Sequence, residues 1–107
     1  MEPDQKLLGE LVRRIVSAVN PLRIVLFGSS CRGEMRPGSD LDVLVVMPDG
    51  THCRQTTALV YRSLLGLGVP KDILVATPAV IEKHRDNESL VYAHALREGK
   101  ELYHAET

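Results

Sequence analysis

The stretch that decides the fold is residues 23–47, with the sequence RIVLFGSSCRGEMRPGSDLDVLVVM. It begins with Arg23–Phe27, a short apolar and β-branched run that is typical of a strand buried on both faces. Gly28-Ser29 ends this run, and residues 34–39 have the composition of a turn. Asp40–Met47 then predicts a second strand, which a Pro-Asp-Gly turn closes. The stretch therefore predicts two strands of a small sheet.

Helices are predicted before and after these two strands in the chain. Residues 3–19 repeat apolar side chains along one helical face. This helix ends at Asn20, because Pro21 disfavours helical geometry in the residue before it. Residues 51–66 predict a second helix. Its inward-facing side chains are expected to be Ala58, Tyr61, Leu64 and Leu65.

The last third of the chain predicts a third strand and two further helices. Lys71–Ala76 is the strand, and Thr77-Pro78 is a cap and first helical residue that start a helix to about residue 84. Residues 88–98 predict a last helix, and residues 101–103 an edge strand or a docked tail. This order of elements predicts an α+β, or mixed α/β, domain with a small sheet flanked by helices.

Length and composition limit the class of protein. The chain has 107 residues, which suits a single domain spanning residues 1–107. Its net charge is −1, so direct nucleic-acid binding through charge is not expected. No apolar run approaches the ~20 residues that a membrane helix needs, and the polar start is not a signal peptide. Cys31 and Cys53 form no zinc-binding spacing, so we expect a reduced, cytoplasmic protein.

Asp40 and Asp42 are the clearest chemical signal. Side chains alternate along a strand, so both carboxylates point to one face, with Cα atoms about 6.6 Å apart. Paired carboxylates repel each other, but together they can hold Mg²⁺, which binds oxygen ligands. Asp72 starts the third strand, where sheet pairing can bring it beside them as a third carboxylate. Taken singly, each aspartate also fits a turn, cap or strand-end role.

Gly28 and Ser29 predict a turn that binds phosphate. They follow a strand at the point where a helix is expected to begin, and the N–H groups at a helix N-terminus attract anions. Glycine also lets a phosphate approach the backbone closely. Arg32 lies about one helical turn further on and can add a charge-assisted contact.

These residues match a known pattern. Gly28-Ser29, ten residues and then Asp40-x-Asp42 fit the signature of the nucleotidyltransferase superfamily with a polymerase-beta-like palm. The finer pattern LFGSSCRGEMRPGSDLDVLV resembles the minimal nucleotidyltransferase (MNT) proteins, in which alanine is usual at the position of Cys31. REGKELY, at residues 97–103, is similar to the C-terminal pattern of the same proteins. The resemblance therefore covers nearly the whole chain.

The resemblance implies a palm-like mixed sheet flanked by helices, and an enzyme. The three aspartates would bind two Mg²⁺ ions, with Asp72 also helping to activate the acceptor hydroxyl. The phosphates of an NTP, ATP by default, would be held by Gly28, Ser29 and Arg32. The reaction would transfer a nucleoside monophosphate to a hydroxyl group and release pyrophosphate.

The same resemblance implies a partner. Small proteins of this type are commonly encoded beside a HEPN-domain protein as the antitoxin of a toxin–antitoxin pair, and some adenylylate a tyrosine of the toxin. Because 107 residues leave no room for an added acceptor domain, we expect a partner protein or a second copy of the chain to complete the acceptor site. Two alternatives stay open. One is a module that binds NTP or the partner without catalysis, and the other is a transferase for a small molecule such as an aminoglycoside.

Overall fold

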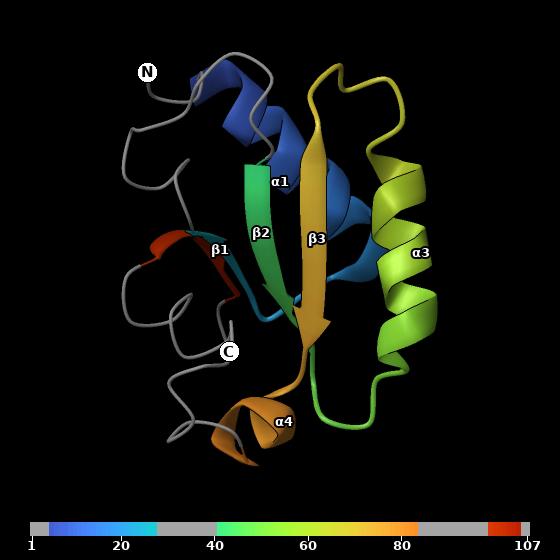
Figure 1. The fold of residues 1–107 in the computed structure, drawn as a ribbon, viewed down its shortest axis with the longest axis vertical. Helices are drawn as coiled ribbons and strands as arrows, with labels where there is room; N and C mark the ends of the chain where they lie inside the picture. The colour runs from blue at the N-terminus through green and yellow to red at the C-terminus, as the bar shows by residue number, and fades with distance from the viewer. Residues whose placement is uncertain (1–4, 28–40, 84–98, 106–107) are drawn as a thin grey trace.

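The computed structural model describes residues 5–27, 41–83 and 99–105 (Figure 1). The strands predicted at residues 23–27 and 71–76 are confirmed, and the strand predicted at residues 40–47 is observed at residues 41–46, whereas the helix predicted for residues 88–98 lies outside the described residues. Within these three ranges no helix is long and apolar enough to cross a membrane. In chain order the elements are α1 (Gln5–Val19), β1 (Arg23–Phe27), β2 (Leu41–Val46), α3 (Cys53–Ser63), β3 (Lys71–Ala76), α4 (Pro78–Lys83) and β4 (Lys100–His104).

The four strands form one mixed sheet in the order β3-β2-β1-β4. β1 is antiparallel to both β2 and β4, and β2 is parallel to β3. A parallel pair needs a crossover connection, which α3 supplies between β2 and β3. β4 pairs with β1, so the C-terminal segment is an edge strand and not a docked tail. The predicted α+β class with a small mixed sheet is confirmed.

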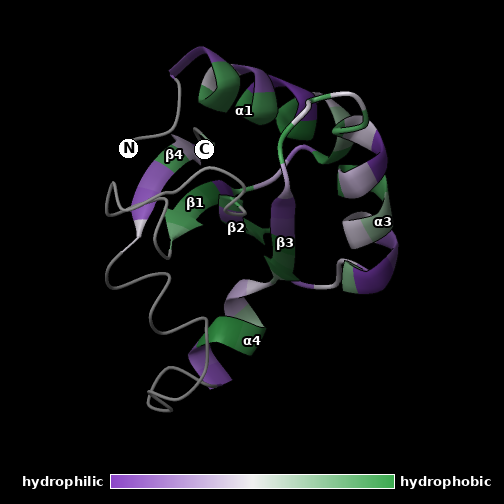
Figure 2. Ribbon diagram, turned by 45° about the horizontal axis from the view of Figure 1, so that its top comes forward, coloured by the Kyte–Doolittle hydropathy of each residue, from purple (hydrophilic) through white to green (hydrophobic). Residues whose placement is uncertain are grey.

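The two faces of the sheet are covered by different helices. α1 and α3 pack on one face, and α4 lies on the other side of the sheet (Figure 2). Because side chains alternate along each strand, successive residues of β2 point to opposite faces. The main core, between the sheet and the first two helices, includes Leu11, Ile15, Val43, Val60 and Leu64. A smaller cluster, on the α4 side, consists of Val25, Leu44, Val46 and Ala76, with Ile81 of α4 packed against it.

Two hydrogen bonds hold the short helix α4 in place. The hydroxyl of Thr77 accepts a hydrogen bond from the Val80 N–H at 3.4 Å, which is the N-cap that the sequence predicts. The carboxylate of Asp49, in the turn after β2, accepts a second one from the Ala79 N–H at 2.8 Å. The end of β2 and the start of α4 are therefore tied together.

The inward face of α3 differs from the prediction. Three residues that were expected to point inward, Ala58, Tyr61 and Leu65, are exposed. The buried positions lie four residues apart and are Thr56, Val60 and Leu64. Thr56 tolerates burial because its hydroxyl donates a hydrogen bond to the carbonyl oxygen of His52 at 3.0 Å. Leu64 is buried as predicted, whereas Thr56 and Val60 were missed because a polar residue interrupts the apolar pattern of the buried stripe.

Leu64 and Leu65 give a matched pair of substitutions that tests this face. The Leu64 side chain is 0% exposed and that of Leu65 is 73% exposed. Leu64→Ala should lower the free energy of unfolding by about 2–5 kcal/mol, because it leaves a cavity in the main core. Leu65→Ala should change it by about 0.5 kcal/mol or less. Urea unfolding followed by circular dichroism measures both values, and equal losses would contradict the observed face.

Candidate active site

Two of the three predicted carboxylates lie side by side in the sheet. Asp42 of β2 and Asp72 of β3 are register partners in the parallel pair. Neighbouring strands are about 4.8 Å apart, and partners in register point to the same face. The parallel pairing therefore brings together two residues that are far apart in the sequence.

Both carboxylates point to the side of the sheet away from α1 and α3. Asp42 precedes Leu44 by two residues, and Asp72 precedes Leu74 by two, so each pair shares a face. Both leucines belong to the smaller cluster on the α4 side. Asp42 is half-buried and Asp72 is exposed. The face that carries the carboxylates is therefore the one that α1 and α3 leave uncovered.

Phe27 extends this row of residues across the sheet. It is the register partner of Asp42 in the antiparallel pair of β1 and β2, and its ring packs against the smaller cluster. In the chain, Phe27 is followed directly by the predicted phosphate-binding Gly28. No sequence pattern indicated that Phe27 and Asp42 are neighbours, because cross-strand register depends on how separate segments pair.

Tyr61 supports the site from α3. Its hydroxyl accepts a hydrogen bond from the backbone N–H of Ile73 at 3.0 Å. Among the described strands β3 lies at the edge of the sheet, so this bond satisfies an outward N–H group that no described strand pairs with. The bond fixes the residue that directly follows Asp72. Sequence periodicity placed Tyr61 in the core, and it carries no signal for a contact with a strand edge.

The remaining predicted site residues lie outside the described residues. These are Gly28, Ser29, Arg32 and Asp40. Within the described ranges, no group of three or more His, Cys, Asp or Glu side chains is arranged to hold a metal ion. The described pair, Asp42 and Asp72, supplies carboxylate oxygens on neighbouring strands, and Mg²⁺ is typically bound by one or two carboxylates together with phosphates and water. The donor set therefore fits a divalent cation.

The proximity of these carboxylates has a measurable consequence for stability. Like charges directly opposite each other in a sheet are destabilising by about 0.2–1 kcal/mol. Asp72→Asn removes one charge at an exposed position and should raise the free energy of unfolding by up to that amount in a buffer without divalent cations. The gain should shrink in 0.5 M NaCl, because salt screens exposed charges. Urea unfolding at both salt concentrations measures it, and a loss of stability would show that Asp72 has a favourable partner.

Solved structures share this fold. A candidate nucleotidyltransferase from Sulfolobus solfataricus is 24% identical to this chain and superposes on it with a TM-score of 0.64. The match covers 95% of this chain and 81% of that chain. A toxin–antitoxin structure with AMP-PNP is 18% identical, with 92% and 74% covered and a TM-score of 0.68. A mutant of the toxin–antitoxin MntA-HpeT is 16% identical, with the same coverage and a TM-score of 0.67. No curated protein matches the chain.

The family itself is shown by the sequence. The family model described as the nucleotidyltransferase domain matches residues 6–96. This match includes both described carboxylates and most of the 107 residues. It agrees with the likeness of the solved structures, which at these identities shows the fold. The chain therefore belongs to the nucleotidyltransferase domain family, as its resemblance to that superfamily predicts.

Proposed function

We propose that this chain is a Mg²⁺-dependent enzyme that transfers AMP from ATP to a hydroxyl group of a partner protein. The partner is a HEPN-domain toxin, and the chain acts as its antitoxin. The observation that carries this proposal is the pairing of Asp42 with Asp72 on the face of a nucleotidyltransferase fold that lies opposite α1 and α3. The similarity to a toxin–antitoxin structure with AMP-PNP supports both the adenine nucleotide and the protein partner.

The two described carboxylates suit different tasks. Asp42 is half-buried and would serve, with Asp40, as a ligand of the cations. Asp72 is exposed, so it would also reach the acceptor and take the proton from its hydroxyl group. The acceptor oxygen then bonds to the α-phosphorus of ATP, and the bond from that phosphorus to the β-phosphate oxygen breaks. Two bound Mg²⁺ ions would supply positive charge at the attacking and leaving oxygens.

The phosphate chain of the nucleotide is assigned to the segment that follows β1. Gly28 and Ser29 would bind the β- and γ-phosphates through backbone N–H groups and a hydroxyl, and Arg32 would add a charged contact. We further propose that residues 1–107 form one domain that works in the cytoplasm. A partner protein or a second copy of the chain would complete the acceptor site.

Substitution of Asp42 tests the catalytic proposal. Asp42→Asn keeps the shape of the side chain and removes the charge that a cation needs. Because metal-assisted charge stabilisation contributes several kcal/mol, transfer should fall by about 1,000-fold or more. Asp49→Asn is the matched control, since Asp49 lies beyond the other end of β2 and its amide oxygen can still accept the Ala79 N–H. This variant should keep wild-type transfer.

The measurement is intact-mass spectrometry after incubation with Mg-ATP and the product of the neighbouring gene, which we propose is a HEPN-domain protein. The expected result is one or more AMP units on the partner, absent with Asp42→Asn and absent with EDTA. A stable complex without any mass increase from ATP, GTP, CTP or UTP would contradict the transferase and favour a module that only binds. Modification of an aminoglycoside without a protein partner would instead favour the small-molecule transferase.

A further inference from the structure

The start of β3 carries Asp72 and lies at the edge of the described sheet. The Leu41 N–H donates a hydrogen bond to the Pro70 carbonyl oxygen at 3.0 Å, which ties the start of this strand to β2. On the opposite edge, the Ile73 N–H donates to the Tyr61 hydroxyl, also at 3.0 Å. Asp72 therefore lies between one hydrogen bond toward β2 and one toward α3.

The main core fixes the helix that carries this hydroxyl. Tyr61 directly follows Val60, which is 0% exposed in the main core. Ile73 is also buried, and no described strand pairs with its outward edge. Removal of the hydroxyl therefore leaves a buried N–H group without its partner, which costs free energy and releases the edge of the strand.

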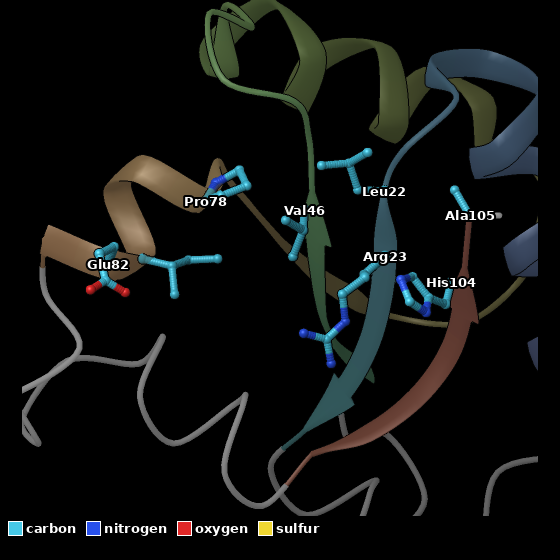
Figure 3. A pocket seen from close by; sticks show the side chains of 8 residues that line it. Leu22, Arg23, Val46, Pro78, Glu82, His104 and Ala105 are labelled. Atoms are coloured by element: carbon cyan, nitrogen blue, oxygen red, sulfur yellow. The ribbon is translucent and has the colours of Figure 1, made fainter. Parts of the chain in front are cut away.

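A pocket beside α4 lies too far along the strands to hold the start of β3. It has a volume of about 400 Å³ and lies between α4 and the adjoining ends of β1, β2 and β4, with Leu22 and Ile81 in its lining (Figure 3). Val46, in its wall, follows Asp42 by four residues, which is roughly 13 Å at about 3.3 Å per residue. The buried Leu44 points to the same face between them. The contact that holds the start of β3 therefore comes from α3.

Charge makes the position of this strand start important. Asp42 and Asp72 are register partners on one face, and like charges directly opposite each other repel. The repulsion acts to push the first residues of β3 away from β2. Binding of Mg²⁺ needs the opposite, because this ion demands oxygen ligands in a nearly ideal geometry. A hydrogen bond that fixes the start of the strand therefore favours the arrangement that binds a cation.

We propose that Tyr61 is a positioning residue whose hydroxyl keeps Asp72 opposite Asp42. This inference rests on the proposed function, which assigns cation binding and proton transfer to Asp72. Tyr61 acts on Asp72 through the backbone of Ile73, the next residue of β3. Loss of a group that orients metal-binding side chains typically lowers metal affinity or activity by about 10-fold to 100-fold.

Tyr61→Phe tests this role, because it keeps the ring and removes only the hydroxyl. Thr56→Val is the matched control. It removes a hydroxyl from the same helix, but one that donates to the His52 carbonyl oxygen at 3.0 Å and not to the sheet. Circular dichroism and urea unfolding establish that both variants are folded, and the other measurements are made well below each thermal midpoint. A purely structural role of Tyr61 predicts the same result for both variants.

Mn²⁺ binding is the first readout, because carboxylates bind this ion and electron paramagnetic resonance detects it without nucleotide or partner. Tyr61→Phe should raise the Kd for Mn²⁺ by about 10-fold, whereas Thr56→Val should stay within twofold of the wild type. Asp72→Asn should also weaken binding, and Tyr61→Phe added to it should cause no further loss, because Tyr61 acts through Asp72. Wild-type affinity in folded Tyr61→Phe, or a full further loss in the double variant, would overturn the inference.

The kinetics of AMP transfer are the second readout, with the product of the neighbouring gene as acceptor. Tyr61→Phe should lower kcat by about 10-fold or more and keep the KM for ATP within twofold, because the phosphates are assigned to the segment after β1. Thr56→Val should keep both values. A wild type that binds Mn²⁺ but transfers no AMP would sink the proposed function, and the Mn²⁺ series would still decide the role of Tyr61. A wild type that neither binds Mn²⁺ nor transfers AMP would overturn both.

Discussion

The parallel register between β2 and β3 is the constraint on which the candidate active site depends. Val43 pairs with Ile73, and both side chains are buried in the main core. Because side chains alternate, this pairing directs Asp42 and Asp72 to the opposite face. A slip of β3 by one residue would turn Asp72 toward the helices, where an unpaired charge costs several kcal/mol. Burial of the hydrophobic partners therefore sets the geometry of the carboxylates.

The same alternation separates stability from chemistry. Most of the buried apolar side chains of the described residues belong to the main core, between the sheet and the helices α1 and α3. The other face has a smaller apolar cluster, the two carboxylates and the pocket beside α4. Substitutions on this second face therefore disturb fewer buried contacts. The Tyr61 hydroxyl ties α3 to the edge of β3, and the Asp49 carboxylate ties the turn after β2 to α4.

Local sequence signals predicted the elements better than their contacts. Arg23–Phe27 and Lys71–Ala76 match the observed strands because each is a short apolar run bounded by turn residues. The face of α3 was mispredicted because Thr56 is polar, and its burial depends on a hydrogen bond that periodicity does not reveal. The pocket was not predicted, because Leu22 and Ile81 meet only after four separate segments have packed. The sequence did predict that sheet pairing can bring Asp72 beside Asp42, and the register of β2 with β3 confirms this neighbourhood.

The repulsion between the Asp42 and Asp72 carboxylates bears on the choice between a transferase and a module that only binds its partner. Two like charges on neighbouring strands weaken the sheet, and one neutral side chain in place of either would relieve the repulsion. A bound divalent cation reverses the balance, because it becomes the largest local charge and attracts both carboxylates. The exposed position of Asp72 leaves its carboxylate accessible from solvent. The paired carboxylates therefore support the cation-dependent transfer that we propose.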